Sequence, residues 1–568
     1  MHYFSGSSIS RLLLTSLIAC ATAGCTAAWN KQAADSASYA VIAEKSNQVP
    51  GMSRDVFIDQ QQVVVLDSWP LNMQSFEFLG AAADSELNAR IIPLEGALDL
   101  TFTHNKDYQL QRERLYLQAL SLTLDRYRYT PIFSSTASGV YDWDASDEFV
   151  RDADTLINVP TGDVVTSETL AARATLGTRL LLRSGGAIAL NLTSNFTRFI
   201  TGNMEETTSS ALIGSFTQPL LRGAGSRIAS ETLMQAERDL LYQLRDFTRF
   251  RQQLSVRVAT QYYTVLQARD VVRNNFQGLS AVMLSLERER AFQAEGLRTP
   301  GQVGRLEQSA LQRDLAWTRS ITRYSNSLDN LKILLGLNAD DKVVLDDSEM
   351  MRVAEAGMVN PDMTLDLAIE LAMSSRLDLF TQVDRIQDRA RKVDVAANAF
   401  LPGLNLLLDA SVPGDSSAIG DLDFRRTDYS AGLSLELPVD QMLERNNYRR
   451  TLIDYEAAVR GYESTVDTVK LQVLDAWRAM QEAEKNYEIS LTSVQINERR
   501  VEEAELRAEL GLGNIQDTVD AQNDLINART ALSGALVDHN VAKLALWRDI
   551  GMLYVDEQGQ WQEGSNER

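Results

Sequence analysis

The chain has 568 residues, only 11 of them proline and 31 glycine, and long tracts rich in Ala, Leu, Glu, Gln and Arg contain neither. This composition favours a few very long helices over several ordinary domains. The formal net charge of −22 argues against nucleic-acid binding, because an acidic protein repels the phosphates of a duplex.

Residues suited to metal binding or catalysis form no recognisable pattern. The three histidines lie far apart, and the two cysteines, Cys20 and Cys25, both lie near the N-terminus. This excludes an internal disulfide or a Cys-based metal site elsewhere in the chain. No nucleophile motif, glycine-rich phosphate loop or metal signature appears, so the sequence predicts no enzyme and no cofactor.

The N-terminus has the features of an export signal. Arg11 precedes the apolar run LLLTSLIACATAG, which is too short to span a bilayer as a helix and has the length of a secretory signal core. Small residues before each cysteine resemble a lipoprotein cleavage site; Leu17 stands at −3 of Cys20, and Ala-Gly precedes Cys25. We take residues 1–24 as the signal and Cys25 as the lipidated residue. Cys20 is the alternative, and an ordinary signal peptide with incidental cysteines is the remaining interpretation.

Residues 25–93 are polar and are interpreted as an irregular or partly ordered periplasmic arm. A first structural repeat is then predicted over 94–355, opening with a short helix from Leu98 to Tyr129. Period-two alternation of apolar and polar residues follows, which indicates half-buried strands. The predicted strands lie at about 131–143, 172–198 and 207–218, the second being a hairpin around a Ser-Gly-Gly turn.

A long helix is predicted at 228–294, where apolar residues recur with heptad spacing. At 1.5 Å per residue it would be about 100 Å long. The glycine-containing segment 295–302 would form a tip at its far end. A shorter helix would then complete the first repeat.

The same order of elements recurs in a second repeat, 356–552. It comprises a short helix from Leu365 to Phe400, strands at about 402–411 and 427–437, a long helix at 445–509 and a tip at 510–516. The long helix keeps strict 4,3 spacing from Tyr448 to Tyr487, which is a coiled-coil seam. Residues 553–568 form a polar C-terminal tail.

The duplicated order of elements limits which fold classes the chain can adopt. The first repeat is longer than the second because it contains the hairpin at 172–198, and the sequence leaves open whether this hairpin adds strands to the sheet. The strands that occur at corresponding places in both repeats number about four per chain, which is below the eight of the smallest closed membrane barrel. Open edges in lipid cost several kcal/mol per backbone group, so several copies must close one barrel. We therefore predict a mainly helical protein with a duplicated helix-strands-long helix-short helix repeat and a transmembrane β portion, whose barrel is closed by several copies of the chain.

The order and spacing of several segments resemble the outer membrane efflux protein (TolC-like) family. They are the strand ending in Gln218-Pro219-Leu220-Leu221-Arg222-Gly223, the segment Arg376-Leu377-Asp378-Leu379, and the break that runs from Gly511 to Gln522. The resemblance covers about 95–550. It implies a homotrimer in the bacterial outer membrane, in which the duplicated repeat forms an α-barrel continuous with a β-barrel. The strands would contact lipid and the helices would extend into the periplasm. It also implies a duct for efflux or type I secretion that docks to a periplasmic adaptor protein and an inner-membrane transporter.

The resemblance assigns adaptor docking to the two tips. The candidate residues are Gly296, Leu297, Thr299, Gly511, Leu512 and Gly513. Glycine tolerates the positive φ that a chain reversal demands. Plain capping of the helix ends would explain these glycines equally well.

Asp517 and Asp520 match the acidic residues that ring the entrance in the family. Their i, i+3 spacing places them on one face of the restarting helix. Three copies would set six carboxylates around the opening and favour cations. The structural alternative is stabilisation of acids by the helix dipole. The first tip differs, because it has Gln302 and Arg305 where acids would be expected.

A different class of function is a periplasmic coiled-coil adaptor or structural protein without a membrane pore. The alternating strands discriminate the two, because only the duct needs them in lipid. The sequence does not identify the transported substrate or the pump, since a duct receives whatever its pump delivers.

Overall fold

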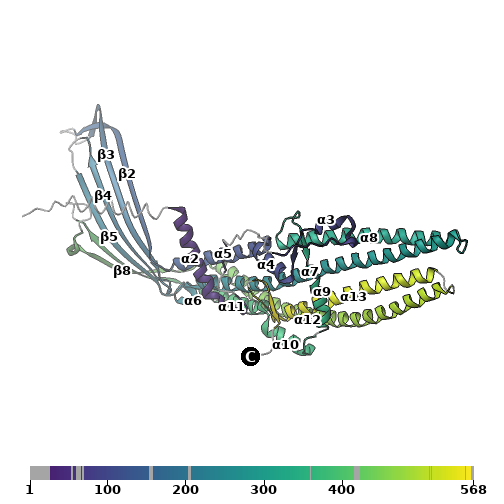
Figure 1. Ribbon diagram of the computed structural model, residues 1–568. Coiled ribbons are helices and arrows are strands. Elements are labelled where there is room, and N and C mark those ends of the chain that lie inside the picture. Colours follow the sequence, from purple (N-terminus) through teal and green to yellow (C-terminus); the bar gives the residue numbers. More distant parts are fainter. Residues whose placement is uncertain are drawn as a thin grey trace, which may run out of the picture. The chain divides into compact units, whose positions relative to one another are not determined.

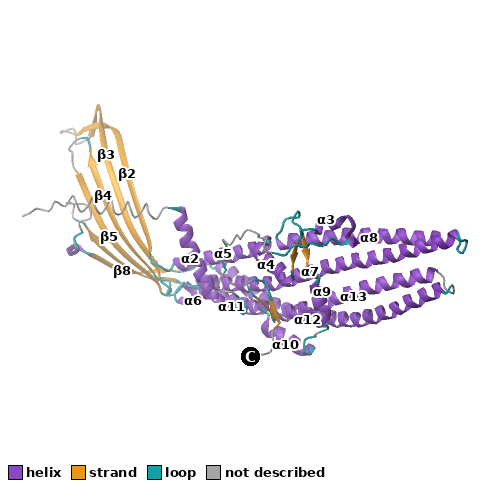
Figure 2. Cartoon of the chain, viewed as in Figure 1, coloured by secondary structure: helices purple, strands orange, loops and turns teal. Residues whose placement is uncertain are grey.

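The chain folds mainly into helices, with one large sheet (Figure 1 and Figure 2). The computed structural model describes residues 26–52, 56–58, 66, 69–151, 158–201, 206–358, 360–414, 422–510, 512, 515–556 and 558–563. The chain divides into two compact units, each assembled from three segments. Unit 1 comprises Met1–Ser38, Gln118–Leu240 and Asp384–Arg460, and unit 2 comprises Tyr39–Leu117, Leu241–Val383 and Gly461–Arg568.

Unit 1 contains a six-stranded sheet with the order β2-β3-β4-β5-β7-β8 (Figure 2). The strands are β2 (Ile132–Arg151), β3 (Asn158–Leu181), β4 (Ala187–Phe199), β5 (Glu206–Pro219), β7 (Gly403–Pro413) and β8 (Asp428–Glu436). Every neighbouring pair is antiparallel. The first repeat thus supplies four adjacent strands and the second supplies two, with β2 and β8 at the edges.

The hairpin expected at 172–198 is an integral part of this sheet. It forms β3 and β4, which lie between β2 and β5, so the described sheet has six strands: the four or so that the two repeats share and the two of the hairpin, whose place the sequence left open. β3 also begins at 158, well before the expected start. Residues 158–168 have strand partners only in β2, beyond the end of β4. Their sequence, NVPTGDVVTSE, lacks the regular apolar-polar alternation by which strands are recognised.

The turn between β3 and β4 requires glycine. Gly185 has a φ of +92°, and a Cβ there would lie 2.6 Å from the carbonyl oxygen of Gly223. The N–H of Leu182 donates to the carbonyl oxygen of Gly186 at 2.7 Å and closes the turn. The Ser-Gly-Gly signal in the sequence therefore marks a tight reversal that no other residue type fits.

The two long helices follow the sequence expectation closely. α7 spans Glu231–Ala294 and is followed by α8 (Pro300–Leu335), while α12 spans Met442–Glu509 and is followed by α13 (Ile515–Ile550). None of the described helices is apolar enough over sufficient length to cross a membrane.

Each predicted short helix is in fact a pair of helices. In the first repeat, α4 (Leu94–His104) and α5 (Lys106–Tyr127) meet at Asn105. In the second, α10 (Leu365–Ser375) and α11 (Leu377–Asn398) meet at Arg376. The expectation of single helices was wrong at these points, because neither residue is a glycine or proline that would announce a break.

The two breaks share one backbone conformation. Asn105 has φ −66° and ψ 127°, and Arg376 has φ −71° and ψ 121°. The Asn105 amide oxygen accepts a hydrogen bond from the N–H of Tyr108 at 2.8 Å and so caps the following helix. The guanidinium of Arg376 contacts the Asp378 carboxylate at 2.8 Å and donates to the carbonyl oxygen of Asp549 at 3.1 Å. This explains the Arg-Leu-Asp-Leu segment as a polar hinge tied to a neighbouring helix.

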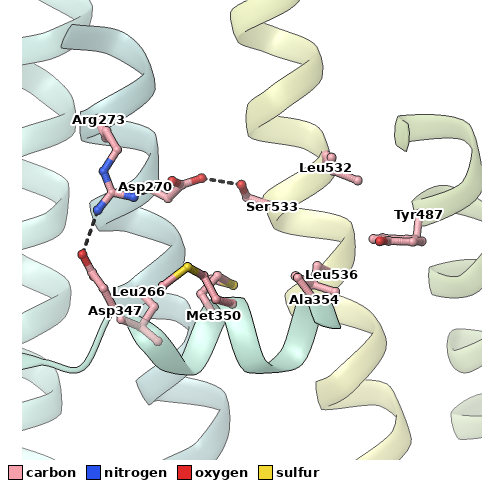
Figure 3. A pocket seen from close by; sticks show the side chains of 11 residues that line it. Leu266, Asp270, Arg273, Asp347, Met350, Ala354, Tyr487, Leu532, Ser533 and Leu536 are labelled. Carbon is pink, nitrogen blue, oxygen red and sulfur yellow. Dashed lines mark hydrogen bonds and ion pairs between the residues drawn. The ribbon is translucent and has the colours of Figure 1, made fainter. Parts of the chain in front are cut away.

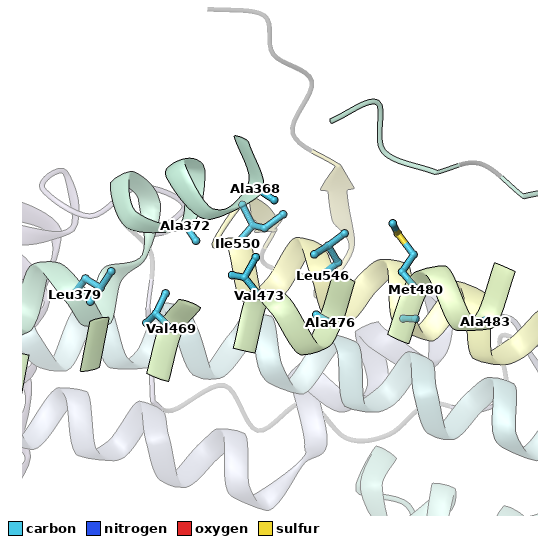
Figure 4. Packing of buried hydrophobic residues seen from close by; sticks show 11 residues of the cluster. Ala368, Ala372, Leu379, Val469, Val473, Ala476, Met480, Ala483, Leu546 and Ile550 are labelled. Atoms are coloured by element: carbon cyan, nitrogen blue, oxygen red, sulfur yellow. The ribbon is translucent and has the colours of Figure 1, made fainter. Parts of the chain in front are cut away.

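The heptad seam of α12 forms much of the core of unit 2 (Figure 4). Its buried members there are Val469, Val473, Ala476, Met480 and Ala483. The other elements contribute Ala368 and Ala372 from α10, Leu379 from α11, and Ala542, Leu546 and Ile550 from α13. The seam predicted from spacing is therefore confirmed over this stretch, and its small alanines allow close helix packing.

The N-terminal arm is partly ordered, which is one of the two alternatives expected for it. α2 spans Ala27–Ser46, and β1 (Arg90–Ile92) pairs in parallel with β6 (Val343–Leu345). The sequence of α2 is polar and Ala-rich, without the apolar stripe that predicts a helix.

A buried ion pair fastens the arm to the long helix α7 within unit 2. The side chains of Arg269 and Glu86 are each only 2% exposed, and Nη2 of the arginine lies 2.8 Å from Oε2 of the glutamate. Tyr324 of α8 donates to Glu86 Oε1 at 2.5 Å, and Asp347 also contacts the guanidinium. Together these contacts neutralise and saturate a charge that would otherwise be costly to bury.

The expected polar tail, 553–568, is also partly structured. β9 (Leu553–Val555) and β10 (Trp561–Glu563) form an antiparallel pair. Arg251 of α7 donates to the carbonyl oxygen of Val555 at 2.9 Å, and Ser255 donates to that of Gly559 at 3.1 Å. The strand pair in the tail was not predicted, because α7 holds the tail through its backbone carbonyl oxygens. Such contacts leave no pattern in the side chains of the tail.

Glu86→Ala is expected to lower the free energy of unfolding by about 3–5 kcal/mol, because it leaves Arg269 buried without its main partner. Glu86→Gln keeps the shape and an acceptor oxygen, so its loss should be smaller. Chemical denaturation of the detergent-solubilised chain, followed by circular dichroism, measures both. Equal losses for the two variants would contradict an electrostatic role for this pair.

Candidate functional site: two helix tips and a two-faced sheet

The first tip reverses the chain between α7 and α8. Gly296 has a φ of +78°, and a Cβ there would meet no atom within 4 Å, so the glycine is needed for its backbone and not for space. The N–H of Leu297 donates to the carbonyl oxygen of Phe292, and that of Gly296 to Gln293, both at 2.9 Å. This is the Schellman pattern of helix termination. The Leu297 side chain is left 65% exposed.

Thr299 then starts α8. Its side chain and that of Gln302 form a capping box, in which the Thr299 N–H donates to Gln302 Oε1 at 3.0 Å. Pro300 follows at the first helical position. Arg298 pairs with the nearly buried Glu289 at 2.7 Å. The tip is thus held by its own hydrogen bonds and presents Leu297 outward.

The second tip repeats this closure between α12 and α13. The N–H of Leu512 donates to the carbonyl oxygen of Arg507 at 2.9 Å, over the same sequence separation as in the first tip. The Leu512 side chain is 80% exposed. Gly511 and Gly513, the other candidates here, lie outside the described residues, as do Cys20 and Cys25.

Asp517 and Asp520 lie in the first turns of α13, and both are exposed. Between them, Val519 is only 4% exposed. It packs in an apolar cluster with residues of α7 and α8, which are Val282, Leu286, Val303, Leu306 and Ala310. This packing fixes one face of α13 and leaves the two carboxylates on the exposed face. The side chain of Gln516 donates to Asp520 Oδ1 at 2.9 Å.

The first tip has no equivalent acids. Asp517 and Asp520 stand five and eight residues after Leu512, and at the same distances after Leu297 the chain has Gln302 and Arg305. Gln302 belongs to the capping box, and Arg305 is exposed. The acidic pair is therefore a property of the second tip alone.

The sheet of unit 1 has one apolar and one polar face. Residues paired across antiparallel strands point to the same side, so the register assigns each side chain to a face. Leu176 pairs with Leu192, Leu192 with Leu212, and Leu212 with Val412. The exposed large apolar residues on this face come from β2, β3, β4, β7 and β8, and they are Phe133, Tyr141, Trp143, Val164, Leu170, Leu176, Ile188, Leu190, Leu408, Tyr429, Leu433 and Leu435. On β5, Leu212 and Phe216 point to the same side and are half-buried. Such an apolar surface marks contact with lipid or with another protein.

The opposite face of the sheet is mainly polar, although the exposed Val140, Phe199 and Ile213 also lie on it. Arg173 pairs with Asn195, and Asp409 pairs with Ser430. Arg179 lies on this face as well, because it is six residues from Arg173 in the same strand. Apolar and polar faces that alternate along each strand are the pattern of membrane strands with one wet side.

A cavity of about 370 Å³ lies within unit 2, beside α7, α9 (Ser348–Ala356), α12 and α13 (Figure 3). Its wall is largely apolar and includes Leu266, Met350, Tyr487, Leu532 and Leu536. At one end Arg273 pairs with Asp347 at 2.8 Å, and Asp270 accepts a hydrogen bond from Ser533.

The charged residues that line this cavity thus have partners, so they do not converge on an open position as catalytic groups do. In the part of the chain that the structure describes, no group of three or more His, Cys, Asp or Glu residues is arranged to hold a metal ion. The cavity is best explained as an imperfectly filled junction between helices of the two repeats.

Sequence reasoning missed Val519, which positions the acidic pair. The available signal was a lone apolar residue at the third position of DTVD, between two acids. An apolar residue one position before Asp520 has to point to another side of the helix. Its partners on α7 and α8 are far away in sequence, so periodicity does not reveal them.

Comparisons with known proteins agree with this geometry. Residues 368–551 match the family described as Outer membrane efflux protein. No curated protein sequence matches the chain.

Solved structures of outer membrane channels share the fold. The CmeC channel of Campylobacter jejuni has a TM-score of 0.58 and 15% identity, covering 83% of this chain and 87% of that one. VceC of Vibrio cholerae has a TM-score of 0.56 and 15% identity, covering 81% and 96%. The open state of the MtrE channel of Neisseria gonorrhoeae has a TM-score of 0.53 and 16% identity, covering 81% and 88%. The resemblance to the efflux protein family and the predicted fold class are both confirmed.

Proposed function

We propose that this chain, which carries an outer membrane efflux protein domain at residues 368–551, is the outer-membrane duct of a tripartite efflux or type I secretion system. Three copies form a passive channel, and no residue has a catalytic role. A periplasmic adaptor and an inner-membrane transporter deliver the substrate. The main support for the proposal is the two-faced sheet, whose apolar face has exposed large apolar side chains on five of its six strands.

The edges of the sheet supply the reason for assembly. Among the described residues, β2 and β8 each have a strand partner on one side only. An edge left open in lipid would expose N–H and C=O groups at several kcal/mol each. Because the strand directions alternate and the number of strands is even, β8 of one copy runs antiparallel to β2 of the next. Identical copies can therefore close a regular antiparallel barrel.

The alternative is a periplasmic coiled-coil adaptor or structural protein without a pore. Such a protein would leave an apolar sheet in water, which favours aggregation. Reconstitution of the purified chain into planar bilayers separates the two functions. The duct predicts detergent-dependent extraction and stepwise conductance, whereas a freely soluble, non-conducting mature chain would establish the alternative.

Lipidation at Cys25, with removal of residues 1–24, would anchor the N-terminus in the same membrane. This proposal rests on the small residues before the cysteine. Mass spectrometry of the mature N-terminus tests it. An unmodified Cys25, or a chain that starts at Cys20, would overturn it.

We further propose that Asp517 and Asp520 ring the periplasmic entrance and favour cations, since three copies place six carboxylates there. The double substitution D517N/D520N is expected to move the cation-to-anion permeability ratio towards one, as measured by reversal potential under a salt gradient. Its control is E463Q/D467N, which removes two exposed acids from the body of α12. If both double variants shift the ratio equally, the effect belongs to net charge and the entrance ring is disproved.

The tips are proposed to dock the adaptor through Gly296, Leu297, Thr299, Gly511, Leu512 and Gly513. The exposed leucines, Leu297 and Leu512, provide the sharpest test, because their main-chain bonds close each tip whatever the side chain is. L297E/L512E is expected to abolish adaptor capture from native membranes while the trimer persists on a non-denaturing gel. Leu284→Glu, at another exposed leucine on α7, is the control and should retain capture. Unchanged capture by the double variant would reduce the tips to simple helix ends.

A further inference from the structure

We propose that the β3–β4 hairpin is a pore-widening insert. The inference rests on the proposed trimer, in which three copies of a six-stranded sheet give a barrel of eighteen strands. Without the hairpin the same trimer would have twelve. With the hairpin, the eighteen-stranded duct would pass bulkier solutes than a twelve-stranded barrel admits.

The register places the hairpin inside the wall and not on its surface. β3 pairs with β4 from Thr169 to Leu181, and on its other side it pairs with β2. β4 in turn pairs with β5 from Ala187 to Arg198. Both strands of the hairpin therefore have hydrogen-bonded neighbours on both sides, which a flap or an extracellular loop would lack.

The hairpin also continues both faces of the sheet. Leu176, Leu190 and Leu192 extend the apolar face between β2 and β5. On the polar face the hairpin carries Arg173 and Arg179, which are both exposed. Guanidinium groups remain ionised and hydrated, so this face fits a water-filled lumen and not a packed interior.

The insert adds an even number of strands, and only an even number keeps every neighbouring pair in the barrel antiparallel. Two added strands leave the directions of β2 and β5 opposed, so the edges β2 and β8 still meet antiparallel between copies. A single added strand would force a parallel contact at every junction between copies. Removal of the hairpin should for the same reason allow β2 to pair directly with β5.

Geometry gives the size of the effect. With strands about 4.8 Å apart and tilted by about 40°, the barrel backbone would be about 36 Å across with eighteen strands and about 24 Å with twelve. Barrels of 16–18 strands leave an aqueous channel, whereas the smallest barrels are filled by side chains. The hairpin therefore widens the barrel about 1.5-fold and its cross-section about 2.3-fold.

The first test compares barrel diameters by electron microscopy of the full trimer. In the variant, a short turn replaces residues 142–205. This removes β3, β4 and the second half of β2, from residue 142 onward. The proposal predicts a native barrel about 1.5-fold wider than that of the variant. Equal diameters, or a native barrel of twelve strands, would overturn it.

A second test does not depend on folding of the deletion variant. Leu190→Cys and Asn191→Cys are adjacent single substitutions on β4 that face opposite sides of the sheet. With the trimer in lipid nanodiscs, a water-soluble maleimide should label the Asn191→Cys chain and spare the Leu190→Cys chain, against the unsubstituted chain as background. Equal labelling would place the hairpin outside the wall. A chain that neither trimerises nor conducts would defeat the proposed function, whereas a conducting trimer with a narrow barrel would defeat only this inference.

Discussion

The need to pair the backbone N–H and C=O groups of the sheet edges governs how this chain can assemble. The sheet has one apolar face that is exposed on most of its strands, yet in the described chain its two edge strands are each paired on one side only. Lipid suits the apolar face but cannot satisfy the N–H and C=O groups of the edges. The proposed self-association would resolve the conflict, because another copy would offer both the missing hydrogen bonds and a continuation of each face.

The duplication explains the regularity of the structure, and its exceptions indicate where the two copies have specialised. Asn105 and Arg376 break corresponding helices with nearly the same backbone angles. At the two tips, the hydrogen bonds donated by the N–H groups of Leu297 and Leu512 have the same length. Only the second tip carries an acidic pair, and only the first repeat carries an additional hairpin. The acidic pair and the hairpin are thus separate additions to one repeated framework.

Much of this structure could be predicted from local sequence pattern. The α12 seam, the strands and the tight turn at Gly185 all follow from spacing or from glycine, because short-range geometry sets them. The features that were missed are fixed by distant partners. Asn105 and Arg376 end helices through side-chain bonds that no breaker residue signals, Val519 is buried by helices about two hundred residues earlier in the chain, and residues 158–168 are strand only because β2 pairs with them. The acidic pair was found by resemblance, but its exposed position depends on the buried valine between the two acids.

Native mass spectrometry of the full-length chain, extracted from membranes in detergent, tests the closure of the sheet most directly. The account predicts a particle of three chains that survives only while detergent or lipid covers the apolar face. A stable monomer of the whole mature chain in detergent-free buffer would contradict it, because one copy would then satisfy its own strand edges and apolar surface without partners.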